Sequence, residues 1–232
     1  MLKTIALITA AGKGQRMQSE IPKQYLCLGE KPILFHTLLV FEECAGVDGI
    51  YLIVPPDQMA MVQKDIVEKY QFKKVLKLVR GGKMRQHSVW NGLQAIRSWC
   101  SIVVVHDGVR PFISCRLIEK SIEEARKNGA AVVGVIAKDT VKRMAKGKKF
   151  LTLPREEIWL AQTPQTFRFP LLVKAYQKAQ QDDTVGTDDA SLVERLDHPI
   201  TLIKGDHCNI KITTPEDFAL AKSFYALGKK GA

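Results

Sequence analysis

Short apolar runs alternate with longer segments of mixed polarity along the first part of the chain. Five of these runs are rich in Val, Ile and Leu, as are strands buried on both faces of a parallel sheet. They are Thr4–Ile8, Ile50–Val54, Val75–Val79, Ile102–Val105 and Ala131–Ile136. Apolar residues at three- and four-residue spacing predict helices between them, at Leu34–Cys44, Asp57–Tyr70, Gln86–Trp99 and Cys115–Asn128. This alternation predicts an α/β fold with a doubly wound, mostly parallel sheet.

The alternation stops after the fifth strand, where a polar, basic segment spans residues 138–154. Its flanks, Thr140–Met144 and Phe150–Leu153, enclose a turn signal at Lys146–Lys148 and predict a two-stranded hairpin. Such a hairpin buries too little surface to be stable without something packed on it. We therefore expect a single domain over residues 1–232, with a protruding arm that needs a partner.

The βα pattern resumes more loosely in the last third of the chain. It predicts two helices and two strands, at Pro170–Gln181, Asp188–Leu196, Thr201–Ile203 and Asn209–Ile212. Thr187 stands where a helix N-cap belongs, since its hydroxyl can accept a bond from the first turn. A final helix begins after Thr214, with Pro215 in its first turn and two acids near its positive end.

Composition narrows the class of protein. The 232 residues are 46% hydrophobic and 25% charged, which is typical of a folded globular chain. The five cysteines are scattered, which favours buried or idle thiols in a reducing cytosol over a disulfide framework. No apolar run approaches the roughly 18 residues that span a membrane. We expect a cytoplasmic protein, or one of the plastid stroma if a transit peptide has been removed.

Charge adds a second constraint. With 35 basic and 24 acidic side chains, the chain carries a formal charge of +11, which favours anionic partners. Charge by itself leaves nucleic acid, membrane surfaces and phosphorylated metabolites open. A basic nucleic-acid-binding protein would interleave its basic residues with exposed aromatics. Aromatics here are only 7% and mostly lie in apolar runs, so we expect neither nucleic acid nor a membrane as the partner.

The loop after the first strand has the composition of a phosphate-binding loop. Gly12 and Gly14 allow the backbone to approach a phosphate closely, and Arg16 and Lys23 add positive charge. A Walker A loop would end in Gly-Lys-Ser/Thr, which this loop lacks, and a dinucleotide fingerprint would need a small residue at Met17. The remaining alternative is an ordinary strand–helix turn with basic residues on its surface.

Two further strand ends carry candidate chemistry. Gly81 and Gly82 follow the third strand and Ser88 opens the next helix, so this turn either faces a flat base or is simply a tight connection. Asp107 ends the fourth strand, where a buried carboxylate needs a counter-charge or a bound cation. One Asp suffices for a Mg²⁺ ion that also bridges triphosphate oxygens. The alternative is a salt bridge between Asp107 and Arg110.

Taken together, these motifs resemble a known family. Gly-x-Gly-x-Arg-Met at 12–17, followed by Pro-Lys-Gln-Tyr at 22–25, is similar to the 2-C-methyl-D-erythritol 4-phosphate cytidylyltransferases. Further matches run in family order from Ala10 to Asp217. The resemblance implies a Rossmann-like nucleotidyltransferase sheet. It also implies transfer of CMP from CTP to a polyol phosphate, with release of pyrophosphate and with Mg²⁺ as cofactor.

The resemblance also assigns roles to individual residues. Catalytic charge falls to Arg16, Lys23 and Lys211, and the metal ligand is Asp107. Nucleotide contacts are carried over to Ala10, Ala11, Gly12, Gly14, Gly81, Gly82 and Ser88. Acceptor contacts are carried over to Asp107, Arg110, Thr140, Arg155, Thr163 and Thr187. Lys83 stands where many relatives have an acid, so no role is carried over to it.

The resemblance gives the arm a partner as well. In this family the arm embraces the second subunit of a homodimer, which would bring Thr140 and Arg155 to the partner's acceptor site. The nearer competitor is a ribitol-5-phosphate cytidylyltransferase, which shares most of these motifs. The context from Arg155 to Trp159, before Gln162-Thr163-Pro164, looks more like the methylerythritol branch. We therefore expect 2-C-methyl-D-erythritol 4-phosphate as the acceptor.

Overall fold

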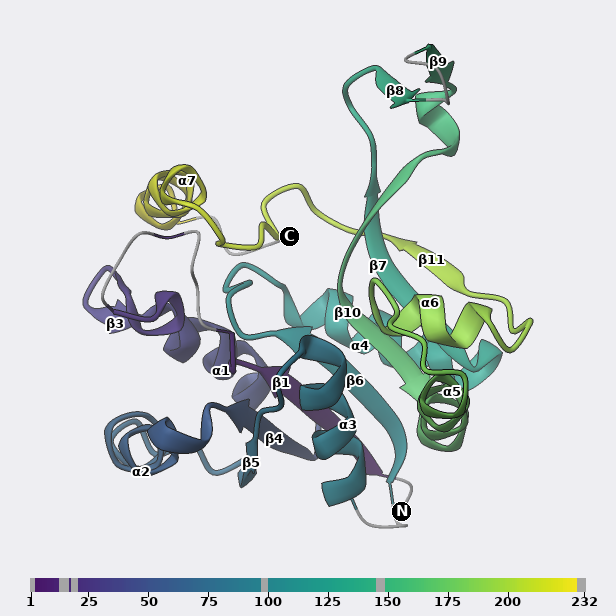
Figure 1. Ribbon diagram of the computed structural model, residues 1–232. Helices are drawn as coiled ribbons and strands as arrows, with labels where there is room; N and C mark the ends of the chain where they lie inside the picture. The colour runs from purple at the N-terminus through teal and green to yellow at the C-terminus, as the bar shows by residue number, and fades with distance from the viewer. Residues whose placement is uncertain (1–2, 13–16, 18–20, 97–99, 145–148, 229–232) are drawn as a thin grey trace.

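The computed structural model describes residues 3–12, 17, 21–96, 100–144 and 149–228. Its main sheet has seven strands in the order β11-β7-β10-β6-β1-β4-β5 (Figure 1). These strands are β1 Lys3–Thr9, β4 Gly49–Val54, β5 Val75–Arg80, β6 Cys100–Asp107, β7 Ala130–Ile136, β10 Trp159–Arg168 and β11 Thr201–Lys204. Strand β10 runs antiparallel to β6 and β7, and the other neighbours pair in parallel. The predicted α/β fold with a mostly parallel sheet is confirmed.

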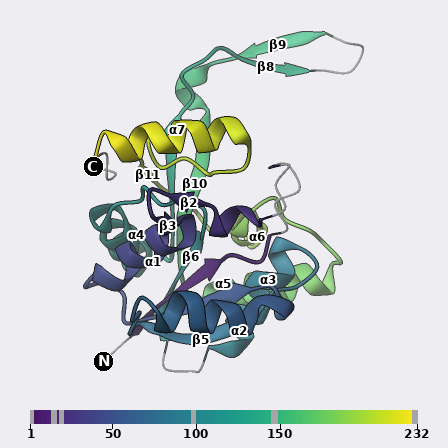
Figure 2. The ribbon, with the colours of Figure 1, turned by 90° about the vertical axis from the view of Figure 1, so that its left-hand side faces the viewer.

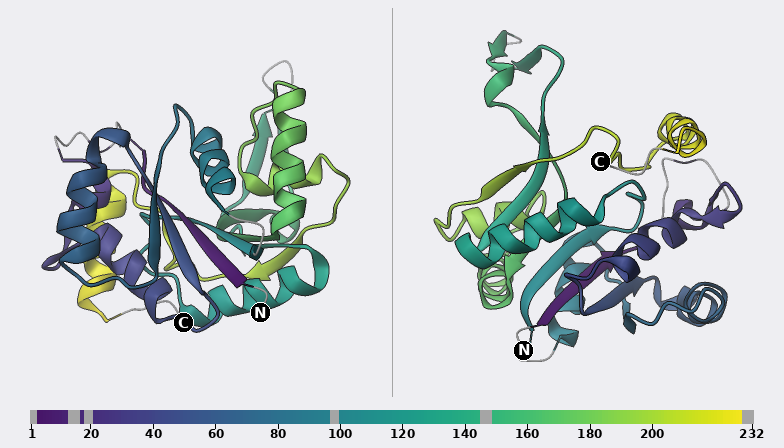
Figure 3. Two further views of the ribbon diagram at one scale, coloured as in Figure 1. Left: turned by 90° about the horizontal axis from the view of Figure 1, so that it is seen from below. Right: turned by 180° about the vertical axis from the view of Figure 1, so that it is seen from behind.

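Helices cover both faces of this sheet (Figure 3). The α-helices are α1 Ile33–Glu43, α2 Met59–Val62, α3 Arg85–Ala95, α4 Cys115–Asn128, α5 Phe169–Gln181, α6 Asp189–Glu194 and α7 Pro215–Ala226. One core lies beneath α1 and α4 and contains Phe41 and Ile118. A second core lies beneath α3 and α5 and contains Leu93 and Leu172. None of the described helices is long and apolar enough to cross a membrane.

The middle of strand β1, from Ile5 to Ile8, is continuously apolar because both faces of the sheet are covered there. Ile5 and Leu7 point into the core beneath α3 and α5, whereas Ala6 and Ile8 point into the opposite core. Successive side chains of a strand alternate between the two faces, so a strand covered on both sides needs apolar residues at every position. The same alternation places Val103 of β6 in one core and Val104 in the other.

The structure corrects three predicted elements. Helix α3 ends at Ala95 rather than Trp99, because Ile96 adopts an extended backbone, and residues 97–99 lie outside the described part. The predicted helix Asp57–Tyr70 consists of a 3₁₀ turn, η3 Pro56–Gln58, then α2 and a π-helical turn, η4 Gln63–Glu68. The predicted strand Asn209–Ile212 is wrong, because the backbone there has no regular secondary structure and pairs with no strand among the described residues.

The predicted caps had mixed outcomes. Thr214 is the N-cap of α7, as expected, and its hydroxyl accepts a hydrogen bond from the Asp217 amide. Thr187 is not the cap of α6. Asp188 takes that position, and its carboxylate accepts a bond from the Ser191 amide. A carboxylate caps as well as a hydroxyl does, so the residue type alone did not distinguish the two neighbours.

Strand β10 was not predicted, because Pro164 and several polar residues interrupt its apolar character. The pairing with β7 shifts register between Ala161 and Gln165, so the proline lies in the irregular part of the strand. This strand brings Thr163 and Gln165 into the middle of the sheet, where both side chains are buried.

The segment before β10 forms the predicted hairpin. Strand β8, Val141–Met144, pairs antiparallel with β9, Phe150–Leu153, in a separate two-stranded sheet. Figures 1 and 2 show this hairpin projecting well away from the main sheet. The predicted turn at Lys146–Lys148 lies within 145–148, outside the described residues. A 3₁₀ turn, η5 Arg155–Glu157, leads from the hairpin back to β10.

Helix α7 closes a small third core. It packs with the short hairpin of β2, Cys27–Leu28, and β3, Lys31–Pro32. Leu28, Val109 and Ile212 are buried in this core together with Ala221 of α7. The core therefore holds the loop after β6 in place, next to the end of that strand.

Candidate active site

A cavity of about 590 Å³ lies where the carboxyl ends of β1, β5 and β6 meet. In an open α/β sheet this edge is the usual place for a ligand. The lining residues are Thr9, Ala10, Ala11, Gly12, Lys23, Gln24, Gly82, Lys83, Met84, Arg85, Ser88, Asp107, Val109, Lys211 and Thr213. Four of these side chains are cationic, and Asp107 is the one carboxylate among the described residues of the lining. The cavity therefore favours an anionic ligand.

The first wall is the loop after β1. The Ala10 amide donates to the Ile53 carbonyl of β4 at 2.8 Å, which continues the sheet by one residue. The Ala10 carbonyl accepts a hydrogen bond from the Gln24 amide group at 3.0 Å. Gln24 is buried in the 3₁₀ turn η2, Lys23–Tyr25, so this bond fixes the position of the neighbouring Lys23 on the cavity wall. Sequence reasoning assigned no role to Gln24.

The second wall is the turn between β5 and α3. The Gly82 amide donates to the Ser88 hydroxyl at 3.0 Å, and that hydroxyl donates to the Met84 carbonyl at 3.1 Å. A Cβ atom on Gly81 would lie 2.3 Å from the Cβ of Ala11. Glycine is therefore required there for the two walls to touch, and Ser88 holds the turn closed besides lining the cavity.

Asp107 lies at the end of β6 among three cationic side chains. Its Oδ2 is 3.0 Å from Lys211 Nζ and 3.2 Å from Arg110 Nε, and its Oδ1 is 3.5 Å from Arg85 Nε. Burial alone would raise the pKa of Asp107, but the charges of Lys211, Arg85 and Arg110 hold it far below its usual value. The salt bridge to Arg110, which sequence analysis gave as the alternative to a bound cation, is present, and two further cations join it.

Arg85 connects this carboxylate to a buried pair, Asp189 of α6 and Tyr176 of α5. Its Nη2 lies 2.7 Å from Asp189 Oδ2, and Asp189 is fully buried. The hydroxyl of Tyr176 donates to the other oxygen of Asp189. Burial would lower the pKa of Arg85, but Asp189 and Asp107 raise it above its ordinary value. Arg85 therefore stays charged, although no role was predicted for it.

A chain of hydrogen bonds supports Asp107 from behind. The Asp107 amide donates to Thr163 Oγ1 at 3.1 Å, and Thr163 Oγ1 pairs with His106 Nδ1 at 3.1 Å. The His106 Nε2 lies 3.2 Å from the Arg110 carbonyl, which can only accept, so Nε2 carries the proton. Burial lowers the pKa of His106 to about 3, which keeps the ring neutral. His106 therefore supports Asp107 as a neutral hydrogen-bonding group.

Lys211 is held by its neighbours on both sides. Arg110 Nη1 donates to the Asn209 carbonyl at 2.7 Å, and the Ile212 amide donates to the Val109 carbonyl at 3.0 Å. These bonds fasten the loop that carries Lys211 to the loop that follows β6. The lysine therefore reaches Asp107 from a loop, not from the strand that sequence analysis predicted.

The structure brings most of the predicted nucleotide-site residues together. Ala10, Ala11, Gly12, Lys23, Gly82, Ser88, Asp107 and Lys211 all line the cavity, with Gly81 packed behind Ala11. Arg110 and Thr163 are buried next to Asp107 rather than on the cavity wall. Gly14 and Arg16 lie outside the described residues. Lys83, to which no role was assigned, also lines the cavity.

The remaining predicted acceptor residues lie elsewhere. Thr187 is exposed in the loop before α6. Thr140 and Arg155 are exposed at the two roots of the arm. Arg155 Nη1 donates to the Lys138 carbonyl at 3.1 Å, and this bond joins the two roots. None of these three residues lines the described cavity.

The carboxylate fits a magnesium ion that takes most of its ligands from a substrate. Oδ1 of Asp107 makes looser contacts, at 3.5 Å to both Arg85 and Thr9, than Oδ2 makes to Lys211. Mg²⁺ in nucleotide sites commonly takes one or two carboxylates, and phosphate oxygens and water complete its octahedral shell. The donor set of this cavity therefore suits such an ion in the presence of a triphosphate.

Comparisons with known proteins converge on one family. The model of the 2-C-methyl-D-erythritol 4-phosphate cytidylyltransferase family matches residues 4–226. A protein of that name from Geotalea uraniireducens is 49% identical, over 96% of this chain and 97% of its own. One from Syntrophus aciditrophicus is 47% identical, over 96% and 95%. The crystal structure of 4-diphosphocytidyl-2C-methyl-D-erythritol synthase from Anaerococcus prevotii is 34% identical, with a TM-score of 0.87 over 97% and 96% of the two chains.

Proposed function

Because the chain belongs to the 2-C-methyl-D-erythritol 4-phosphate cytidylyltransferase family, we propose that the cavity at the ends of β1, β5 and β6 is its active site. The protein is a cytidylyltransferase. It joins CTP to 2-C-methyl-D-erythritol 4-phosphate and forms 4-diphosphocytidyl-2-C-methyl-D-erythritol in the non-mevalonate synthesis of isoprenoid precursors. The observation that carries the assignment of the site is the pair of touching loop walls beside a carboxylate held by three cations.

The cavity separates two tasks. Its walls, the turns at Ala10–Gly12 and Gly81–Ser88, present backbone groups at close range, which suits a flat base and a ribose. Lys23 and Lys211 supply positive charge on the same cavity, which suits a triphosphate. We assign the base to the walls and the phosphates to these lysines. Arg16, which the family resemblance adds to the phosphate site, lies outside the described residues.

The transfer requires one bond to form and one to break. An oxygen of the acceptor phosphate attacks the α-phosphorus of CTP, and the bond from that phosphorus to the bridging oxygen breaks. Pyrophosphate leaves with the electron pair. The attacking phosphate is already anionic, so no general base is needed, and the protein has to position two polyanions and stabilise the charge between them. Lys23 and Lys211 would meet this requirement, because fixed donors act where the new charge develops.

Magnesium is the proposed cofactor. Asp107 would hold it, and when bound the ion neutralises charge on the triphosphate oxygens. The low pKa of Asp107 supports this role, because the charges of Lys211, Arg85 and Arg110 keep the buried carboxylate ionised. The three cations that keep Asp107 ionised also keep it in one position, so it is ready to accept the ion together with the nucleotide.

The acceptor site is proposed to need a second subunit. Thr140 and Arg155 are exposed at the arm, and the arm carries Met144 and Phe150 at 68% and 66% exposure. Large exposed apolar side chains on a two-stranded hairpin support a surface that another chain covers. A homodimer is the simplest such arrangement, since closed twofold dimers are the commonest assembly. We propose that the arm completes the partner's acceptor site and that the protein works in the cytoplasm.

The deciding experiment measures pyrophosphate release from CTP with each polyol phosphate in parallel. We expect rapid release with 2-C-methyl-D-erythritol 4-phosphate and Mg²⁺, and little release with ribitol 5-phosphate or after chelation. Faster release with ribitol 5-phosphate would identify ribitol 5-phosphate as the acceptor instead. Salt-sensitive retention on heparin without any transfer activity would instead indicate a nucleic-acid-binding protein. A Lys211→Met variant is the control for pyrophosphate released by another activity. If the reaction takes place in this cavity, the rate of release must fall in this variant.

A further inference from the structure

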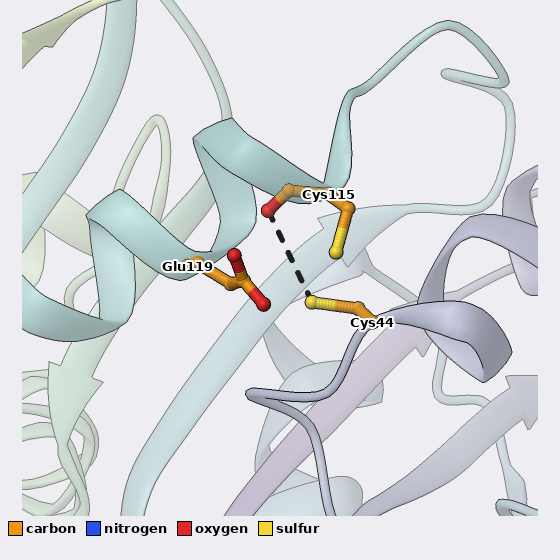
Figure 4. A group of neighbouring side chains, drawn as sticks. All are labelled: Cys44, Cys115 and Glu119. Atoms are coloured by element: carbon orange, nitrogen blue, oxygen red, sulfur yellow. Dashed lines mark hydrogen bonds between the residues drawn. The ribbon is translucent and has the colours of Figure 1, made fainter.

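Two thiols and a carboxylate meet where α1 ends and α4 begins (Figure 4). The Sγ atoms of Cys44 and Cys115 and a carboxylate oxygen of Glu119 all lie within 4.8 Å of one another. Cys44 is buried, Cys115 is half-buried and Glu119 is exposed, so the cluster runs from the core to the surface. None of the three lines the active-site cavity.

Local structure fixes the direction of each side chain. Cys44 is the C-cap of α1, and its amide donates to the Val40 carbonyl. Cys115 is the first residue of α4 and Glu119 follows it by four positions, so both lie on the same face of that helix. The thiol of Cys44 points at the Cys115 carbonyl, 4.0 Å away. The helices thus place the three ligand atoms within 4.8 Å of one another.

We propose that Cys44, Cys115 and Glu119 bind a thiophilic divalent cation of the zinc class, at a second site separate from the active site. Two thiolates and one carboxylate are a donor set that zinc accepts, with water in the fourth position of a tetrahedron. A hard ion such as Mg²⁺ prefers oxygen ligands and does not suit two sulfurs. A zinc–sulfur bond is about 2.3 Å long, so the two sulfurs must move closer to each other around the ion. The Glu119 side chain is exposed and can move with them.

The surroundings help the thiols to become ligands. The backbone of Gly46 forms a hydrogen bond with the Cys44 sulfur that favours its thiolate. Cys115 stands at the N-terminus of a fourteen-residue helix, whose dipole also favours a thiolate. Opposing this, burial and then the neighbouring Cys115 raise the pKa of the Cys44 thiol to about 12. A bound cation must therefore expel that proton, as metals do on binding cysteine.

The site would act on the fold rather than on the reaction. Cys44 belongs to the same buried core as Leu38 and Phe41 of α1 and Ile118 of α4. A cation bound to Cys44 and Cys115 would join the two helices that cover this face of the sheet. Any ligand that binds only the folded chain stabilises it, so zinc should raise the melting temperature.

Cobalt(II) is the probe that tests the site directly. Reduced, chelator-treated chain is titrated with Co²⁺, in the absence of nucleotide and with millimolar Mg²⁺ present. We expect one equivalent to bind, with the visible bands of tetrahedral cobalt and a thiolate charge-transfer band, and zinc should then displace it. Cys44→Ser and Cys115→Ser should abolish the bands, and the exposed Glu119→Gln should weaken binding about tenfold or more. Cys27→Ser changes an exposed thiol outside the cluster and should bind as the natural chain does.

Three results would overturn the proposal. The first is a natural chain that shows no thiolate band at saturating Co²⁺. The second is a band that survives both Cys115→Ser and Glu119→Gln, because neither change empties the core. The third is a disulfide that forms between Cys44 and Cys115 under a mild oxidant, while the reduced chain binds neither Co²⁺ nor Zn²⁺. Zinc should also raise the melting temperature of the Cys27→Ser chain but not that of Cys115→Ser.

Discussion

The cavity and the arm are built in opposite ways. The charged groups at the end of β6 are paired within the chain: Asp107 contacts three cations, and Arg85 also contacts Asp189. The arm has a four-residue ladder and exposed side chains, and Arg155 is anchored through Lys138 and Glu156 at its own root. The cavity is preorganised within one chain, whereas the arm offers groups that have little support from the rest of their chain.

This difference indicates how the two substrates are to be held. A nucleotide site that works by electrostatic preorganisation needs its charges in place before the substrate arrives. An acceptor site that is completed on assembly can leave its groups on a projecting hairpin. The comparison therefore predicts that cavity substitutions act within their own subunit and that arm substitutions act on a neighbour.

The largest effect is expected at Lys23. Its position on the cavity wall is set by the Gln24 bond to Ala10, so Lys23→Ala should fold normally. Turnover should fall about 10²-fold or more, as is typical when a transition-state donor is lost. Steady-state kinetics at saturating substrates measures this. Lys83→Ala removes another lysine of the same cavity and should have a smaller effect, and near-normal turnover of Lys23→Ala would exclude a catalytic role.

Base selectivity tests the two walls themselves. The exocyclic amine of cytosine can donate to backbone carbonyls, whereas the carbonyl of uracil would face them with an acceptor. Leaving such groups unpaired in a closed site costs about 1–3 kcal/mol, so kcat/KM with UTP should be roughly 5- to 150-fold lower than with CTP. Competition assays with both nucleotides measure the ratio. Equal efficiency would mean that the touching loops of Ala11 and Gly81 do not read the base.

Lowering the pH tests how much the neutral His106 ring behind Asp107 contributes to the stability of the fold. The pKa of His106 is lowered to about 3 in the folded protein, from 6.5 when exposed. The unfolded chain therefore binds more protons below pH 6.5, and stability is present above that pH and lost as pH falls towards 3. At pH 5 this single ring should cost on the order of 2 kcal/mol.

Denaturant unfolding at pH 7.5 and pH 5 measures the acid loss, with His106→Gln as the comparison. The variant should be less stable at pH 7.5, because the bonds to Thr163 and Arg110 are disturbed, yet should lose less on acidification. Parallel losses in the two proteins would assign the acid sensitivity to other groups.

Complementation tests the arm and has the smallest expected signal. Lys23→Ala and Arg155→Ala chains, each nearly inactive, are mixed under conditions that exchange subunits. In a mixed dimer one site carries both changes, and the other keeps its own Lys23 and receives an intact Arg155. Half of the dimers are mixed after random exchange, so activity should return to about a quarter of the natural level.

Two controls make that result interpretable. Exchange must be verified by mass, and Arg155→Lys should restore little, because lysine cannot reproduce the forked donor of arginine. If exchange is complete and no activity returns, Arg155 acts within its own subunit and the crossing arm is wrong.

The sequence predicted the parts of the fold that local periodicity determines. Strand β1 is apolar at every position from Ile5 to Ile8 because both faces are covered, and that run can be seen in the sequence. Strand β10 was missed because its burial comes from insertion between β6 and β7, which outweighs its proline and its amides. The Asn209–Ile212 segment was misread for the converse reason, since alternating residues there serve a loop pinned to Val109.

The residues of the candidate site also fall into those that the sequence predicted and those that it did not. Gly82, Lys23 and Asp107 were predictable because motif residues at strand ends converge in an open sheet. Arg85 and Asp189 were not, because their importance arises from partners distant in sequence. Gln24 was not, because its role is a bond to the Ala10 carbonyl that only the folded loop brings within reach. Asp189 follows Arg85 by more than a hundred residues and meets it only through the packing of α3, α5 and α6. One sequence gives no sign of such a contact.

The antiparallel pairing of β7 with β10 has a consequence for how this protein can change over time. Ile136 is paired with Trp159, and the Ala137 amide bonds to the Ile158 carbonyl, so the chain leaves and re-enters the sheet at one closed point. The segment between these residues does not affect the pairing of β7 with β10. Lengthening, shortening or replacing the arm would leave the strand alignment and the cavity untouched. Its reach and its contacts can therefore diversify among descendants of this chain while the nucleotide chemistry is kept constant.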